Sequence, residues 1–249
     1  QAKPEANGAI GNIPNINELP YFSTVPWNAL PLNNSLAGLA NSVFTDYNNG
    51  LDNLASAGMI SNTERDLRKI NFSAGQNGFL IDDKTLTDLS EMGLPPIMQT
   101  NVNDKVALTT GQILGSNSGD DPTLIYGVTV PIADNYIMLP SEQAEMEAQI
   151  NTFNQIIATT VSANGDRLVL VDTKNLLEKI GQGAVTANGI AITSSISPPY
   201  GAFSTDGVHP NARGSAVVAN HFIEAINGKW NSTIPMANPN AYIGNDLPR

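Results

Sequence analysis

Apolar residues recur at the roughly three-to-four-residue spacing of an amphipathic helix in several stretches of the chain. The clearest stretch begins at Ser141, and its apolar stripe continues until Gly165 supplies a stop. Shorter helices are predicted from Asn34 or Ser35 as N-cap to Leu54, from Ser61 to Ile70, over residues 175–180 and over residues 215–226.

Shorter apolar runs predict strands. Residues 9–13 form one such run, and residues 167–172 form another that directly follows the helix ending at Gly165. An apolar run that ends in Asp directly after a helix is typical of a buried parallel strand. We therefore expect two buried parallel strands. A hairpin is predicted at residues 185–192 around Asn188-Gly189, and small strands or turns are predicted at 71–81, 106–108 and 124–130.

The order of these elements predicts an α/β fold that the sequence enters part-way. A strand like that at residues 9–13 normally belongs to a sheet begun earlier in a chain, and almost no sequence precedes it here. The residues between the two strands, 14–166, then form a long insertion. This insertion has a helical part and, at residues 82–140, an irregular part rich in Pro and Gly.

Composition narrows the function classes. The 249 residues carry a formal net charge of −11, which argues against nucleic acid or an anionic lipid surface as a partner. The absence of cysteine removes disulfides, thiolate chemistry and cysteine-type zinc sites. No apolar run reaches the length of about 18 residues that spans a membrane. Few Lys and many Asn, Gly, Thr and Ser favour an extracytoplasmic protein.

One loop, Ser204-Thr205-Asp206-Gly207-Val208-His209-Pro210, carries a candidate catalytic pair. Asp206 lies three residues before His209, which is one of only two histidines. A carboxylate at this spacing can hold an imidazole in the tautomer needed for general-base work. Gly207 and Pro210 favour a turn directly before the last helix, and such loops often carry function. From the residues alone, the motif is a catalytic pair, a capping arrangement or a coincidence of spacing.

Other polar residues favour structural interpretations. His221 lies at helical spacing with Glu224 three residues later, which is typical of a half-buried or surface helix residue. Asp82-Asp83 and Asp120-Asp121 lack the alternating oxygen ligands of a calcium loop, so we interpret them as solvated loop carboxylates. The sequence therefore predicts neither a metal site nor a bound cofactor.

Several segments resemble one hydrolase family. Residues 203–210, then Arg213-Gly214, Ala219-Asn220 and Phe222-Ile223, closely resemble the last conserved block of SGNH (GDSL-type) hydrolases. The resemblance is greatest to surface-exported, lipoprotein-type members from Gram-negative bacteria. It extends to Gly11-Asn12-Ile13-Pro14, to residues 19–26 and to residues 121–124, so it covers nearly the whole chain but only the family's C-terminal half.

This resemblance implies a flavodoxin-like three-layer α/β/α fold, with residues 1–249 forming the C-terminal portion of one domain. In that family a histidine base serves a serine nucleophile near the N-terminus, and an aspartate three residues earlier orients the imidazole. These roles carry over to His209 and Asp206. The serine and the Gly and Asn oxyanion donors belong to blocks N-terminal to this sequence.

Two segments mimic those missing blocks. Asn34-Ser35-Leu36-Ala37-Gly38 resembles the nucleophile motif, but Asn33 stands where the family has Gly and no predicted strand leads into it. We therefore interpret Ser35 as a helix N-cap. Gly244-Asn245-Asp246 mimics part of the oxyanion block but lies after His209, so we interpret it as tail.

The leading hypothesis is the C-terminal part of a serine esterase or acyl-hydrolase that supplies the base His209 and its partner Asp206. The expected partners are the missing N-terminal half of the same polypeptide, an outer-membrane protein complex, and a small-molecule, lipid or glycan ester as substrate. The expected location is the bacterial cell surface or outer membrane, with a lipoprotein anchor in the missing part. The alternative is a non-catalytic extracellular binding or accessory subunit that retains the fold.

Overall fold

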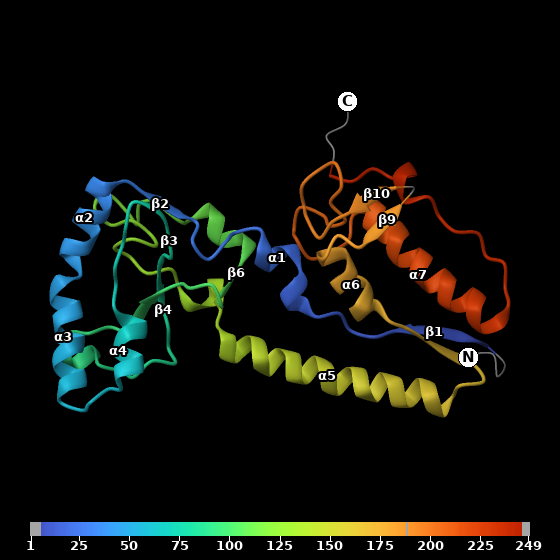
Figure 1. Cartoon of the computed structure of the whole chain (residues 1–249), viewed down its shortest axis with the longest axis horizontal. Helices are drawn as coiled ribbons and strands as arrows, with labels where there is room; N and C mark the ends of the chain where they lie inside the picture. The colour runs from blue at the N-terminus through green and yellow to red at the C-terminus, as the bar shows by residue number, and fades with distance from the viewer. Residues whose placement is uncertain (1–5, 188, 246–249) are drawn as a thin grey trace. The chain divides into compact units, whose positions relative to one another are not determined.

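The computed structural model describes residues 6–187 and 189–245, and the chain divides into two compact units (Figure 1). Unit 1 combines Gln1–Thr24 with Ser141–Arg249, and unit 2 is Val25–Pro140. Unit 2 therefore lies wholly within the segment that separates the two predicted parallel strands. The protein is mixed α/β, and every sheet among the described residues has two strands.

Unit 1 is built around two parallel strands. Strand β1 (Gly8–Gly11) pairs with β8 (Leu168–Val171), and Gly8 lies opposite Leu168 in the register. This confirms the two strands and their parallel pairing. The other elements of unit 1 are α1 (Pro20–Ser23), α5 (Pro140–Ala163), α6 (Thr173–Gly181), α7 (Ala212–Trp230), the antiparallel hairpin β9 (Val185–Ala187) and β10 (Ile190–Ile192), and the 3-10 turns η1 (Ile16–Glu18) and η5 (Pro239–Ala241).

The expectation that both strands are buried is wrong for most of their length. All four residues of β1 are half-buried, and in β8 Leu170 is exposed while Val171 alone is buried. The cause is that each strand has a single neighbour among the described residues. Parallel sheets normally have both faces covered and more than two strands. Helix α7 packs against both strands, and the outer edge of each strand pairs with no further strand among the described residues.

Unit 2 has its own hydrophobic core, which includes Leu51, Phe79, Ile81 and Ile132. The predicted irregular segment 82–140 is ordered and contains only short elements, as expected. The elements of unit 2 are α2 (Asn34–Val43), α3 (Thr45–Ser56), α4 (Asn62–Arg68), the antiparallel pairs β2 (Leu30–Leu32) with β3 (Gly75–Asn77), β4 (Leu80–Asp82) with β5 (Ile97–Gln99) and β6 (Lys105–Val106) with β7 (Ile137–Met138), and the 3-10 turns η2 (Ser90–Met92), η3 (Leu108–Gln112) and η4 (Asp134–Tyr136).

The helix predicted from Asn34 or Ser35 to Leu54 is two helices, and its N-cap is Asn33. The Asn33 side chain accepts a hydrogen bond from the Leu36 backbone N–H at 2.9 Å, so Ser35 lies inside the first turn. The break falls at Phe44, whose ring is buried and packs at 6.4 Å between centroids against Tyr47. The chain changes direction where this ring is buried, and the helical spacing of apolar residues over 34–54 does not predict that break.

A fully buried arginine holds unit 2 together. The Arg68 guanidinium donates to the backbone oxygens of Thr87, Leu94 and Pro95 and to the Glu64 carboxylate, at 2.8 to 3.1 Å. Its Nε also donates to the Tyr47 hydroxyl at 3.2 Å. Breaking a buried pair by removing one partner is costly because the remaining groups stay buried without hydrogen bonds.

We expect Arg68→Met to destabilise unit 2 by about 3–5 kcal/mol. Arg65→Met is the matched control, because Arg65 lies on the same helix but forms partly exposed ion pairs with Asp52 and Asp66, and it should cost less than about 1 kcal/mol. Urea unfolding followed by fluorescence of Trp27, in a Trp230→Phe background, measures unit 2 alone. Equal losses for the two variants would contradict this role of Arg68.

A buried carboxylate makes the stability of unit 2 depend on pH. Asp104 is buried, its Oδ2 accepts two hydrogen bonds from Asn101, and its Oδ1 has no hydrogen-bond partner among the described residues. Burial, with a further contribution from the charge of Asp83, raises the pKa of Asp104 to about 6 despite those hydrogen bonds. The folded state therefore takes up this proton at a higher pH than the unfolded state.

Because the folded-state pKa is raised, unit 2 should gain stability as the pH falls through about 6 towards the unfolded value of about 4. Relative to Asp104→Asn, the native chain should gain about 1 kcal/mol between pH 7 and pH 5. Urea unfolding of both proteins at the two pH values measures this difference. A native chain that loses stability relative to the variant over this interval would show that the pKa is not raised.

Candidate functional site

The loop with the candidate pair is closed by backbone hydrogen bonds at its base. The Ser204 N–H donates to the His209 oxygen at 2.8 Å, and Phe203 and Pro210 form an antiparallel bridge. The Gly207 N–H donates to the Ser204 oxygen at 3.0 Å across the turn. Residues 204–209 therefore form a compact loop rather than an open connection.

Asn211 joins this loop to helix α7. Its buried side chain donates to the backbone oxygens of Gly201 and Phe203 at 2.9 and 3.1 Å and, as the N-cap of α7, accepts from the Gly214 N–H at 3.0 Å. Gly214 is needed because a Cβ there would lie 2.0 Å from the Ala202 oxygen. Both ends of the loop are thus held against the first turn of α7.

The two oxygens of Asp206 have different partners. Oδ1 accepts hydrogen bonds from the Ser204 hydroxyl at 2.7 Å, the Val208 N–H at 2.8 Å and the His209 N–H at 3.0 Å. Oδ2 lies 2.8 Å from Nδ1 of the His209 ring. One oxygen therefore folds the loop, and the other holds the imidazole.

Asp206 is ionised at neutral pH. Its pKa is held well below the ordinary value, first by the hydrogen bond from the Ser204 hydroxyl and then by those from the Val208 N–H and the His209 side chain. An ionised carboxylate only accepts hydrogen bonds, so Nδ1 of His209 must carry the proton. In the neutral ring, the lone pair is then on Nε2.

The His209 side chain is 78% exposed, and its Nε2 makes no hydrogen bond within the described part of the chain. An imidazole fixed at Nδ1 by a carboxylate and open at Nε2 has the geometry of a general base. The described residues place no nucleophilic hydroxyl in hydrogen-bond contact with Nε2. The described residues therefore contain an Asp–His pair with triad-like geometry but no complete catalytic triad.

The short helix α1 supports the loop from the other side. The Tyr21 N–H donates to the Gly207 oxygen at 3.0 Å, and Gly207 has a φ of +73°. A Cβ on Gly207 would lie 2.7 Å from the Tyr21 nitrogen. Gly207 is therefore required both by its backbone conformation and by the close approach of α1.

An apolar cavity of about 250 Å³ lies beside the loop. The residues on either side of His209 in the sequence, Val208 and Pro210, contribute to its wall, and α6 and α7 supply most of the rest. Val208 remains 40% exposed. The face of the loop next to His209 is thus apolar.

The other sequence candidates have structural surroundings. His221 is a partly buried residue of α7, as predicted, and its Nε2 donates to the Asp172 backbone oxygen at 3.1 Å. Asp121 is exposed and accepts from Thr123, as expected of a turn carboxylate. Asp83 is not solvated, contrary to the prediction, because it is buried and accepts from Thr85. Within residues 6–187 and 189–245, no three His, Asp or Glu side chains form a group able to hold a metal ion.

Sequence reasoning missed two asparagines that hold the loop. Asn211 was not singled out, although an Asn directly before an apolar helix is an N-cap signal. Asn245 is more than tail, because its side chain donates to the backbone oxygens of Ile196 and Phe203 at 2.6 Å each. No local pattern marks this second contact. Asp246, the last residue of the oxyanion-like segment, lies outside the described residues.

Comparisons with protein-family models, with curated proteins and with solved structures found no match to this chain. None of the described helices combines the length and the apolar character needed to cross a membrane.

We expect Gly207→Ala to lower the free energy of unfolding of unit 1 by more than the strain of a positive φ alone would. Gly183→Ala is the matched control, because Gly183 also has a positive φ (+67°) but its Cβ would meet no atom within 4 Å. The control should cost about 1–3 kcal/mol of unit 1 stability, and Gly207→Ala should cost more because it must also displace α1. Urea unfolding followed by Trp230 in a Trp27→Phe background measures both. Equal costs would show that α1 does not support the loop.

Proposed function

We propose that Asp206 and His209 are the orienting acid and the general base of an SGNH-type serine ester hydrolase. The observation that carries this proposal is the 2.8 Å contact from Asp206 Oδ2 to His209 Nδ1, which leaves Nε2 exposed. The resemblance of residues 203–223 to the last conserved block of that family supports the same roles. Because Asp206 is ionised, it stabilises the imidazolium that forms when Nε2 takes a proton.

The reaction proposed is acyl transfer through a serine. Nε2 of His209 accepts the serine hydroxyl proton as the serine oxygen bonds to the ester carbonyl carbon. The imidazolium then gives that proton to the departing alcohol as the ester C–O bond breaks. Water repeats the sequence on the acyl-enzyme and releases the acid. The apolar cavity lined by Val208 and Pro210 lies beside this loop and offers a place for an apolar part of the ester.

The serine and the oxyanion donors are proposed to come from a further, N-terminal part of the same polypeptide. The support is the parallel pair β1 and β8, whose faces are half-exposed and whose outer edges pair with no other strand among the described residues. Additional parallel strands at one edge would complete a flavodoxin-like three-layer sheet. Since active sites of open α/β sheets lie at the carboxyl ends of strands, such strands can bring a serine to that end.

The extracytoplasmic, lipoprotein-type location and the ester class remain predictions from composition and resemblance.

The test is labelling of the full-length polypeptide that contains this sequence with a fluorophosphonate probe, which reacts with base-activated serines whatever their acyl specificity. We expect one labelled serine outside the present 249 residues. Removing a triad residue costs about 10³-fold or more in the rate of attack, so His209→Gln should abolish labelling. Asp206→Asn should slow it by about 10²-fold or more.

His221→Gln is the matched control, because it removes the other histidine of the present 249 residues and should leave the labelling rate unchanged. Equal labelling of the parent and His209→Gln would overturn the role of His209. A folded full-length protein that takes up no probe would overturn the hydrolase proposal and favour the non-catalytic binding alternative.

A further inference from the structure

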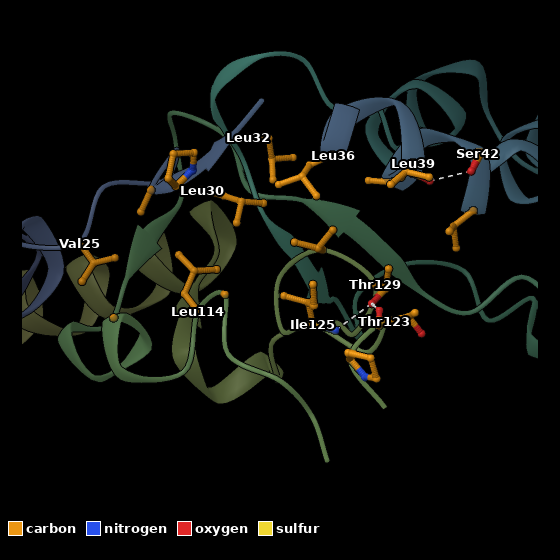
Figure 2. Close-up of a pocket in the computed structure, with 18 residues that line it drawn as sticks. Val25, Leu30, Leu32, Leu36, Leu39, Ser42, Leu114, Thr123, Ile125 and Thr129 are labelled. Atoms are coloured by element: carbon orange, nitrogen blue, oxygen red, sulfur yellow. Dashed lines mark hydrogen bonds between the residues drawn. The ribbon is translucent and has the colours of Figure 1, made fainter. Parts of the chain in front are cut away.

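Unit 2 contains an apolar groove that the proposed hydrolysis does not use. We call it the β2–α2 groove; Leu30 and Leu32 of β2, Leu36 and Leu39 of α2, and Ile125 are among its lining residues. Its volume is about 760 Å³, which lies within the roughly 300–1,000 Å³ typical of small-molecule sites. Figure 2 shows side chains from β2 and α2 facing those of the loops around Leu114 and Ile125.

The floor of the groove is part of the core, and small residues make the space. Leu30, Ala40 and Val128 are buried, so the floor is fixed by the packing of unit 2. Ala29 and Gly111 are small residues of the lining, and a Cβ on Gly111 would lie 3.3 Å from the side chain of Val25, which also lines the groove. The space is therefore a built feature of a well-packed unit.

One face of α2 is left without a partner at this groove. Leu36, Leu39 and Val43 recur at helical spacing and are 47%, 64% and 59% exposed. Exposed apolar residues scattered singly need no explanation, but a contiguous stripe beside a groove marks an interaction site.

The polar groups of the groove are already satisfied. The Ser42 hydroxyl donates to the Leu39 oxygen at 2.7 Å, and the Thr129 hydroxyl donates to the Thr123 oxygen at 2.6 Å while accepting from the Ile125 N–H (Figure 2). No ionisable side chain lines the groove. A ligand therefore gains by burying hydrocarbon and not by hydrogen bonds or ion pairs.

Size and charge decide between the candidate occupants. The volume of the groove matches small-molecule sites and its lining is mostly apolar, which favours a small hydrocarbon ligand over a second copy of the chain. Asp120 and Asp121 directly precede the lining residue Pro122, and the whole chain carries a net charge of −11. An anionic headgroup is thus repelled at low ionic strength.

We propose that unit 2 binds the hydrocarbon chain of a neutral small amphiphile in the β2–α2 groove. This inference does not rest on the proposed hydrolase activity. It assigns unit 2 a binding function of its own.

The test uses the 249-residue chain and N-phenyl-1-naphthylamine, a neutral probe that fluoresces in apolar sites. We expect the probe to bind saturably at one site. 1-Dodecanol should displace it, and dodecanoate should need at least a tenfold higher concentration to do so. Leu39→Glu should weaken probe binding at least tenfold because it places a charge in the groove, and it should preserve folding because Leu39 is 64% exposed.

Leu67→Glu is the matched control, because Leu67 is an exposed apolar helix residue (44%) that does not line the groove. Ala29→Phe, which fills the groove without adding charge, should also abolish binding. Equal probe affinity in Leu39→Glu and the parent would overturn the inference. A different result would also overturn it: sedimentation velocity shows a concentration-dependent dimer that is lost in Leu39→Glu, and the monomer binds no probe.

The outcomes separate this inference from the proposed hydrolysis. If the probe binds at the groove but the full-length polypeptide is not labelled by fluorophosphonate, only the hydrolase proposal is overturned. If the polypeptide is labelled but the groove binds no probe, only the binding function of unit 2 is overturned.

Discussion

The carboxylate of Asp206 is the interaction on which the site depends. Through Oδ1 it gathers a hydroxyl and two backbone N–H groups, and through Oδ2 it fixes the imidazole of His209. These hydrogen bonds favour the ionised form and lower its pKa, so the group that shapes the loop is the same group that sets the tautomer. The same carboxylate therefore folds the loop and orients the imidazole.

The surroundings of the loop explain how an exposed pair can still be well positioned. Asn211 anchors it to the first turn of α7, Asn245 donates to its base, and α1 contacts it at Gly207. The histidine ring itself is open to solvent, and the outer edges of β1 and β8 pair with no further strand within the described residues. The loop is therefore anchored at its base while the histidine ring stays open to solvent, as the proposed general base requires.

Local signals predicted much of the fold. Ser61 caps α4 by accepting from the Glu64 N–H, and the apolar run at 167–172 became β8 in a parallel pair, both as expected. Predictions were wrong where distant contacts decide. The break at Phe44 coincides with packing of its ring against Phe72, and the buried Asp83 donates its backbone N–H to the Pro96 oxygen. The Asp206–His209 pair was found from its spacing, but its distances, Asn245 and the β2–α2 groove required the three-dimensional structure.

The two histidines offer the most direct test of this account, because their ring contacts call for opposite tautomers. Nδ1 of His209 donates to a carboxylate, whereas Nε2 of His221 donates to the Asp172 backbone oxygen. Two-bond ¹⁵N–¹H correlation spectra of the chain at alkaline pH, where imidazole rings are neutral, report both directly. We predict the Nδ1–H form for His209 and the Nε2–H form for His221. The Nε2–H form at His209 would contradict its assignment as a base oriented by Asp206.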